Sequence, residues 1–246
     1  MHRQMNNLKT YFHNFESIDK KKKSILFIPG AGMDHRFVRA LSFPEADYNP
    51  PLVIDVPGHG WTKGSPCNDI QSYSKFLIHA LRESNLENLV LCGHSMGGLI
   101  ALDMLIHHGF LAQSLILLNS IYPIRVSDTL IEKAKAGNGY AADFIIKFGL
   151  HKRLLGMKNI FPQEESLVML SDLEACNNFQ LNHQDLEKLK LPISLILGSK
   201  DKLVNLKEVD NFANHSSCKV YTMNEVGHFP FFENPDELSQ LITSVI

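Results

Sequence analysis

The stretch Leu89–Leu99, LVLCGHSMGGL, places a single serine among residues that have almost no bulk. Apolar residues lead into Gly93, and Gly97 follows Ser95 at the same spacing, which gives the pattern G-x-S-x-G between a predicted strand and a predicted helix. A strand that turns sharply into a helix holds this serine in a strained backbone conformation and exposes its hydroxyl. The glycines remove side chains that would collide with neighbouring backbone. Ser95 is therefore a candidate nucleophile, and an incidental serine in a glycine-rich turn is the alternative.

His228 is the best candidate among the twelve histidines for the base that a serine nucleophile needs. It lies in EVGHFPFFENP, after a predicted strand and before a predicted helix. It also comes last in the chain order serine, acid, histidine. The alternative is a loop histidine packed against Phe229 and Phe231.

Asp201 is the candidate for the acid that orients this histidine. It follows a predicted strand in LPISLILGSKDKLV, whereas Asp143 and Asp172 are less well placed, and its alternative role is that of a turn or capping residue. A parallel sheet brings the loops that follow its strands to one edge. Ser95, Asp201 and His228 are therefore expected to converge.

An oxyanion hole requires two N–H donors near the nucleophile. One candidate is the backbone N–H of Met96, at the start of the helix after the serine. The other is the N–H of Ala31, in the loop FIPGAGMDH, where Gly30 and Gly32 permit a tight turn. The competing interpretation is a phosphate-binding loop, but the residue that would complete G-x-G-x-x-G is His35.

Short apolar runs alternate with amphipathic stretches along the chain, which is typical of an α/β protein with a mostly parallel twisted sheet and helices on both faces. The expected parallel strands are Ser24–Ile28, Leu52–Val56, Asn88–Cys92, Ser114–Leu118, Ile193–Leu197 and Lys219–Met223, with Thr10–Glu16 as an antiparallel edge strand. The expected helices are Asp69–Ser84, Met96–His108, Leu206–Asn214 and Pro235–Val245.

One segment breaks this alternation. Residues 121–189 contain helical patterns but no convincing strand, and Leu191-Pro192 then leads back into the sheet. The segment is predicted to be a helical cap inserted between two strands. The core is then formed by residues 1–120 and 190–246.

Composition excludes several classes of protein. The 246 residues are 44% hydrophobic and 20% charged, with a formal net charge of −2, so neither nucleic acid nor an anionic membrane is an expected partner. No apolar stretch approaches the roughly 18 residues that cross a bilayer, and the first nine residues contain no apolar run that could export the chain. We therefore expect a reduced, cytoplasmic protein in which the four cysteines are mostly small core residues.

With these residues assembled, the chain resembles the α/β-hydrolase superfamily over nearly its whole length. LFIPGAGMDHRFV is similar to the oxyanion loop of that family, VIDVPGHGWT to its D-x-P-G-H-G stretch, and LCGHSMGGLIAL to its nucleophile elbow. LILGSKDKLV and VGHFPFFENPDEL are similar to its acid strand and its histidine loop. Two departures are Pro29, where many members have histidine, and Trp61 after Gly60, where small residues are common. Asp55, His59 and Gly60 are interpreted as turn residues of the scaffold.

The resemblance implies a serine hydrolase of the carboxylesterase type that cleaves an ester or thioester of a small molecule through an acyl-enzyme. It implies neither a metal nor an organic cofactor. Dehalogenases and epoxide hydrolases of this fold carry an aspartate at the position of Ser95, which argues against both. The alternatives are a hydrolase of carbon–carbon bonds in diketones, a carrier-linked methyl ester esterase, and a ligand receptor without catalysis.

Substrate contacts are expected in the cap. Phe144 and Phe148 could line an apolar acyl pocket together with Phe229, although packing in the core is the competing use. A basic group in the cap could dock an acidic acyl carrier, and a solvated face is its alternative; the group comprises Lys147, Lys152, Arg153 and Lys158. The sequence leaves open the acyl length, the bond type, the oligomeric state and the pathway.

Overall fold

The fold is described from a computed structural model of the chain, which covers residues 1–5, 8–82, 84, 86, 89–161, 166–216 and 218–246. Its centre is an eight-stranded sheet with the order β1-β2-β4-β3-β5-β6-β7-β8. The strands are β1 (His2–Met5), β2 (Leu8–His13), β3 (Ser24–Ile28), β4 (Leu52–Ile54), β5 (Leu89–His94), β6 (Ser114–Leu118), β7 (Ile193–Gly198) and β8 (Lys219–Met223). β1 and β2 pair antiparallel at one edge, and the other six strands run parallel.

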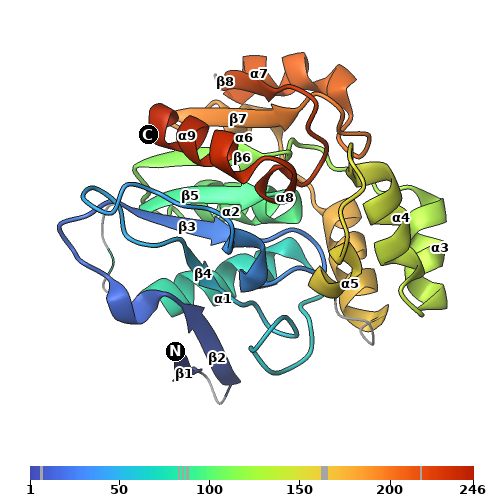
Figure 1. Cartoon of the computed structure of the whole chain (residues 1–246), viewed down its shortest axis with the longest axis horizontal. Coiled ribbons are helices and arrows are strands. Elements are labelled where there is room, and N and C mark those ends of the chain that lie inside the picture. Colours follow the sequence, from blue (N-terminus) through green and yellow to red (C-terminus); the bar gives the residue numbers. More distant parts are fainter. Residues whose placement is uncertain (6–7, 83, 85, 87–88, 162–165, 217) are drawn as a thin grey trace.

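Two apolar cores lie on opposite faces of this sheet, because successive residues of a strand point to opposite sides. Leu26 and Ile28 of β3 belong to one core, which contains α1 (Ile70–Arg82), α2 (Met96–Ile106) and α7 (Val209–Ser216). Ile25 and Phe27 belong to the other, which contains α8 (Pro230–Glu233) and α9 (Pro235–Val245). Helices therefore cover both faces (Figure 1), and the predicted α/β fold is confirmed.

Residues 121–189, called the insertion below, connect β6 to β7. They form α3 (Asp128–Ala136), α4 (Tyr140–Gly149), a 3₁₀ turn at Met157–Ile160, α5 (Ser166–Asn178) and α6 (His183–Leu186). Figure 1 shows α3, α4 and α5 beyond the arrowheads of the parallel strands. The loops that carry the candidate site residues leave the sheet at that same edge.

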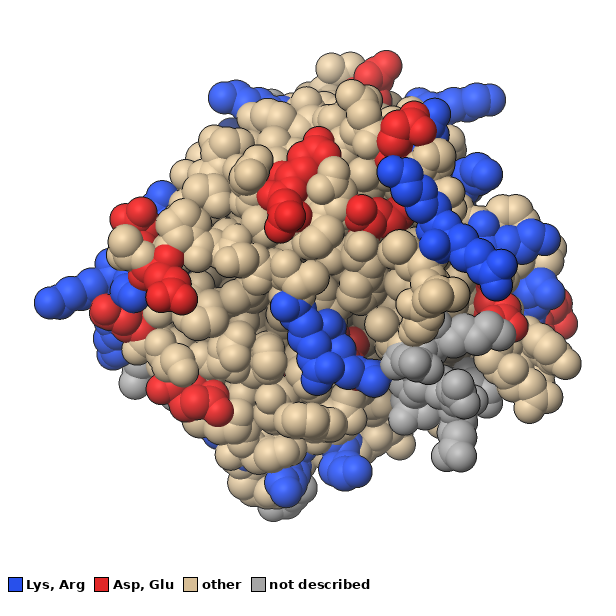
Figure 2. All heavy atoms as spheres, viewed as in Figure 1, with Lys and Arg blue, Asp and Glu red and all other residues tan. Residues whose placement is uncertain are grey.

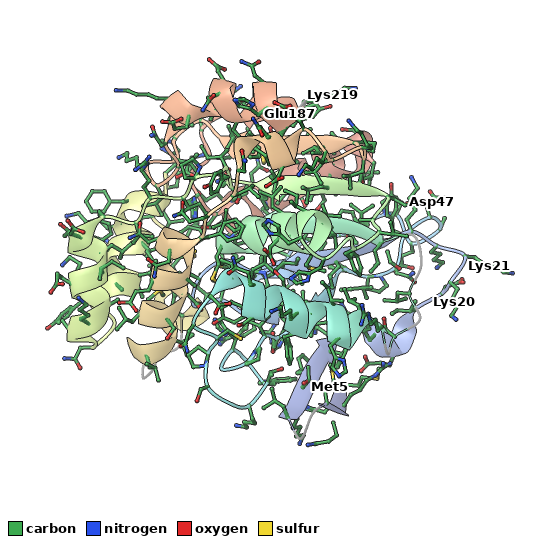
Figure 3. All side chains as sticks on the ribbon, turned by 180° about the vertical axis from the view of Figure 1, so that it is seen from behind. Met5, Lys20, Lys21, Asp47, Glu187 and Lys219 are labelled. Carbon is green, nitrogen blue, oxygen red and sulfur yellow. The ribbon has the colours of Figure 1, made fainter. Side chains whose placement is uncertain are left out.

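The lysine run at residues 20–23 lies far from the insertion. Figure 3, drawn from behind, shows Lys20 and Lys21 at the opposite end of the molecule from α3 and α4. Both side chains are exposed.

The observed elements differ from the predicted ones mainly at the N-terminal edge. β1 was not predicted, and β2 is Leu8–His13 instead of Thr10–Glu16 because Asn14 adopts φ 62° and the chain turns into a 3₁₀ helix. β4 ends at Ile54, and the expected helix Leu206–Asn214 begins as a 3₁₀ turn, Leu206–Glu208, before α7. Asn88, predicted to start a strand, lies outside the described residues.

Candidate active site

Ser95 lies at a strained turn between β5 and α2. Its backbone angles are φ 50° and ψ −119°, a conformation that costs free energy for a residue with a side chain. A Cβ atom at Gly97 would lie 2.0 Å from the carbonyl oxygen of Ile28, and one at Gly93 would lie 2.4 Å from that of Gly97. The Ser95 N–H donates to the Leu118 carbonyl at 3.1 Å. The two glycines are thus required by close approach of backbone, as the sequence predicted.

Asp201 and His228 meet beside this turn. Nδ1 of His228 lies 2.6 Å from Oδ2 of Asp201, and both side chains are buried. The other carboxylate oxygen of Asp201 accepts the N–H groups of Leu203 and Val204 at 2.7 and 3.2 Å. Since a carboxylate accepts, Nδ1 carries the donated proton, and Nε2 of the neutral ring is left to accept one.

The loop that carries His228 is fixed from the core. His94 Nε2 lies 2.8 Å from the His228 carbonyl oxygen, to which it donates. Burial first, and then the neighbouring His228, lowers the pKa of His94 well below its usual value, so this ring is neutral. Asn119, directly after β6, donates to the Gly227 carbonyl at 2.7 Å and accepts the Gly198 N–H at 2.8 Å.

The insertion holds the same loop from the other side. The N–H of His228 donates to the carbonyl of Gly149, the last residue of α4, at 2.6 Å. Glu233 joins the two segments, because one of its carboxylate oxygens accepts the N–H of Gly227 and the other accepts that of His151, each at 2.9 Å. The histidine loop is therefore clamped between the sheet and the insertion.

The loop after β3 supplies the other candidate groups. The Met33 N–H donates to the Gly30 carbonyl at 3.1 Å and closes a tight turn around Ala31. In the planar trans peptide between Gly30 and Ala31, the N–H points opposite to that carbonyl. Ala31 borders the same cavity as Ser95. Met96 is the first residue of α2, so its N–H has no carbonyl partner within the helix.

Asp172, a buried carboxylate in the insertion, contacts this loop. The sequence did not predict this contact. Asp172 of α5 accepts from the Gly32 N–H at 2.8 Å, from His59 Nε2 at 2.8 Å and from the Tyr73 hydroxyl at 2.6 Å. Burial alone would lower the pKa of His59, but the charge and hydrogen bond of Asp172, with the Pro57 carbonyl, raise it to about 9. His59 is therefore an imidazolium at neutral pH.

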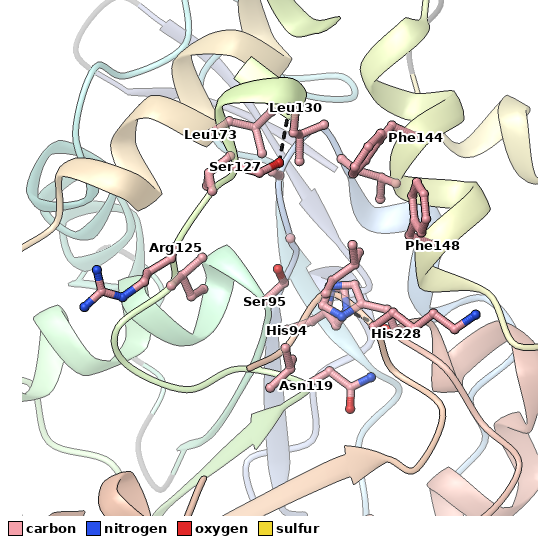
Figure 4. A pocket seen from close by; sticks show the side chains of 18 of the residues that line it. His94, Ser95, Asn119, Arg125, Ser127, Leu130, Phe144, Phe148, Leu173 and His228 are labelled. Carbon is pink, nitrogen blue, oxygen red and sulfur yellow. Dashed lines mark hydrogen bonds between the residues drawn. The ribbon is translucent and has the colours of Figure 1, made fainter. Parts of the chain in front are cut away.

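A cavity of about 290 Å³ opens above Ser95, and His228 and Ala31 also border it. Figure 4 shows the Ser95 hydroxyl pointing into this space, with Phe144 and Phe148 on the opposite wall. Phe229 borders it as well, so the three aromatic residues named from the sequence surround one cavity. The insertion contributes most of the apolar wall, including Leu130, Phe144, Ile145, Phe148, Phe161 and Leu173.

Other site types find no support in the part of the chain that the structure describes. No three His, Cys, Asp or Glu side chains there are grouped so that they could bind a metal ion. Among the same residues, no helix has the length and apolar character that crossing a membrane requires. All four cysteines are described, and none forms a disulfide.

Comparison with known proteins identifies the family of the chain. The family model described as the alpha/beta hydrolase family matches residues 25–241. The chain belongs to the alpha/beta hydrolase family. It is a hydrolase of this type, and its sequence relatives and structural neighbours include esterases.

This hydrolase is similar over most of its length to proteins of named activity. It is 23% identical to the 3-oxoadipate enol-lactonase 1 of Acinetobacter baylyi, over 91% of this chain and 88% of that one. It is 24% identical to the pimeloyl-(acyl-carrier protein) methyl ester esterase of Aromatoleum aromaticum, over 78% of this chain and 85% of that one. The structure of an esterase from Exiguobacterium antarcticum has a TM-score of 0.86 with 18% identity, covering 99% of this chain and 97% of that one. At that identity the likeness demonstrates a common fold.

Proposed function

We propose that the chain is a serine hydrolase that cleaves a carboxylic ester or thioester through an acyl-enzyme. Ser95 is the nucleophile, His228 the base and Asp201 the orienting acid. The observation that carries the proposal is the 2.6 Å contact between His228 and Asp201 beside a serine held at φ 50°. Strain of this kind persists where the surrounding structure enforces it, and it is concentrated at functional sites.

The reaction proceeds in two halves. Ser95 Oγ attacks the carbonyl carbon while Nε2 of His228 takes its proton, and Asp201 stabilises the imidazolium that forms. His228 then gives this proton to the leaving oxygen or sulfur, and the acyl group remains on Ser95. Water, activated by His228, attacks the acyl-enzyme and releases the acid. The N–H groups of Met96 and Ala31 stabilise the oxyanion in both halves.

The insertion acts as the cap that selects the substrate. Its aromatic and aliphatic side chains form most of the apolar part of the cavity wall, so an apolar acyl group is the expected occupant. The relatives named as an enol-lactonase and as a methyl ester esterase support a small-molecule ester as the substrate class.

Hydrolysis of p-nitrophenyl esters from acetate to laurate tests the proposal. Wild type is expected to turn these esters over, and Ser95→Ala to lose at least a thousandfold in kcat. Ser114→Ala is the matched control, because this buried serine lies at the start of β6, away from the cavity. Equal rates for wild type and Ser95→Ala refute the proposed nucleophile. If wild type turns over none of these p-nitrophenyl esters, simple esterase activity is refuted, and diketones and carrier-linked esters are tested next. Tight binding of a ligand without turnover would identify a receptor.

An acidic acyl carrier is a second candidate partner. Lys147, Lys152 and Arg153 are exposed at the end of α4 and after it, whereas the side chain of Lys158 lies outside the described residues. Figure 2 shows Lys and Arg side chains gathered on the side of the molecule where the insertion lies. Exchange of Lys152 and Arg153 to glutamate is expected to raise KM for carrier-linked esters and to leave KM for p-nitrophenyl acetate unchanged. Equal KM values of wild type and the double variant for the carrier-linked ester refute carrier docking.

A further inference from the structure

We infer that Asp172 is a positioning residue, which orders the oxyanion loop from the insertion and thereby couples the cap to the chemistry at Ser95. The inference rests on the proposed function and adds to it a residue that lies outside the candidate triad and the oxyanion donors. Asp172 is fully buried and does not border the cavity, so it acts through the loop rather than on substrate.

Three donors from three separate core segments converge on this one carboxylate. Oδ2 accepts the Gly32 N–H of the loop after β3 and Nε2 of His59 in the turn after β4, both at 2.8 Å. Oδ1 accepts the hydroxyl of Tyr73, in α1, at 2.6 Å. A side chain of the insertion thus joins parts of the core that are otherwise distant in sequence.

The contact with Gly32 bears directly on the candidate donor. The Gly32 N–H belongs to the peptide bond between Ala31 and Gly32. Because a peptide is planar, fixing the direction of this N–H fixes the orientation of the whole peptide plane that follows Ala31. Gly32 adopts φ +68°, a conformation that glycine reaches readily. Because many other conformations are equally accessible to glycine, a hydrogen bond is needed to hold it in this one. The Met33 N–H holds the preceding peptide through the Gly30 carbonyl, at 3.1 Å. Together the two bonds fix both peptides that flank Ala31.

Charge explains why a carboxylate is used here. A buried anion is costly unless it is paired and hydrogen-bonded. His59 is an imidazolium because Asp172 raises its pKa to about 9 against the opposing effect of burial. The ion pair and the two further donors therefore hold the carboxylate in one orientation, with Oδ2 toward Gly32.

A purely structural role would also lower stability, so the test needs a matched control. Asp103 provides it, because this carboxylate is equally buried and has a histidine partner, His107, at 2.7 Å. It lies near the far end of α2 from Ser95 and does not border the cavity. Asp103→Ala removes a buried carboxylate from its pairing with the exposed His107, without touching the oxyanion loop.

The experiment compares Asp172→Ala, Asp172→Asn and Asp103→Ala by ester hydrolysis and by hydrogen exchange of the Gly32 amide. Asp172→Ala is expected to lower kcat 10–100-fold, with KM within threefold, and to speed exchange at Gly32. Asp172→Asn has an amide oxygen that can still accept the Gly32 N–H. This variant is expected to recover part of the lost kcat and part of the protection of the Gly32 amide from exchange. Asp103→Ala is expected to lower the unfolding temperature while kcat stays within threefold.

Three results would overturn the inference: a folded Asp172→Ala with kcat within threefold of wild type, equal losses of kcat in Asp172→Ala and Asp103→Ala, or unchanged exchange at Gly32. If Asp172→Ala does not fold, Asp172→Asn must still show faster exchange at Gly32 than wild type. If wild type hydrolyses no ester, the proposed function fails, and the exchange measurement decides by itself whether Asp172 orders the loop.

Discussion

Asp201 and His228 are 27 residues apart in the chain, and Oδ2 of the first lies 2.6 Å from Nδ1 of the second. The other oxygen of Asp201 is occupied by the N–H groups of Leu203 and Val204. The carboxylate is therefore unable to turn away from the histidine, and it selects the ring tautomer with its proton on Nδ1. This arrangement leaves Nε2 available to a nucleophile.

Asp201→Asn is expected to lower kcat by about 10³–10⁴-fold while the fold is retained. The amide is isosteric, but its NH₂ group cannot accept from Nδ1–H and favours the tautomer with its proton on Nε2. The measurement is kcat for p-nitrophenyl acetate, with circular dichroism to check folding. A folded variant with kcat within tenfold of wild type would show that Asp201 does not orient the base.

The His59–Asp172 pair predicts that stability depends on pH. The pKa of His59 is raised in the folded state from 6.5 to about 9, so protonation favours the folded form. The contribution, about 3 kcal/mol, is fully present below pH 6.5 and is lost as the pH rises through 9. The groups that act on the ring include Asp172 and Asp55, both of which raise its pKa. Urea unfolding at pH 6, 7.5 and 9.5 measures the effect.

His59→Gln is the control for this pH dependence, because other groups also titrate in the same range. The difference in unfolding free energy between wild type and His59→Gln is expected to shrink from pH 6 to pH 9.5. A difference that stays constant over this interval would mean that His59 is not an imidazolium in the folded protein.

Asn119→Ala is expected to lower both stability and kcat. Its side-chain amide joins the Gly198 N–H to the Gly227 carbonyl, and the substitution leaves these two backbone groups without that partner. Loss of buried hydrogen bonds of this kind costs about 1–3 kcal/mol. Because Gly227 precedes His228, kcat is expected to fall about tenfold with little change in KM. Loss of stability with unchanged kcat would show that Asn119 does not position the histidine loop for catalysis.

Phe148→Ala is expected to shift the preferred acyl chain to greater length. The cavity, about 290 Å³, is near the lower end of the range for ligand sites, roughly 300–1,000 Å³, so wild type should favour short acyl groups. Removal of the Phe148 ring enlarges the cavity on the side opposite Ser95. The ratio of kcat/KM for laurate to that for acetate should rise at least tenfold, and Phe110→Ala, outside the cavity, should leave it unchanged. An unchanged ratio in Phe148→Ala would place the acyl group elsewhere.

Much of the parallel sheet could be predicted from the sequence, because strands buried on both faces are continuous apolar runs. Ser24–Ile28 and Ser114–Leu118, buried throughout, are correct to the residue. The edge strand Lys219–Met223 is also correct to the residue, although only its last residue is buried. β1 was missed because HRQM lacks an apolar pattern, and its place depends on pairing with β2. Propensity contains no information about such a partner.

Within the candidate site, motif spacing predicts Ser95, Asp201 and His228, each of which follows a strand of the same sheet in the structure. The sequence offers Asp172 only as an acid for His228 that is less well placed than Asp201. A usable signal was its helical spacing from Met169 and Cys176, which puts a carboxylate on the buried face of α5. Its partners His59 and Tyr73 come from distant segments, so the network itself could be found only in three dimensions.

Covalent labelling with diethyl p-nitrophenyl phosphate tests most directly whether Ser95 is an activated nucleophile. Intact mass and peptide mapping are expected to show one diethylphosphoryl group per chain, on the peptide that contains Ser95. Labelling should be absent in Ser95→Ala and at least a hundredfold slower in His228→Ala, which lacks the base. Modification at another residue, or equal labelling of wild type and Ser95→Ala, would contradict the assignment of Ser95 as the nucleophile.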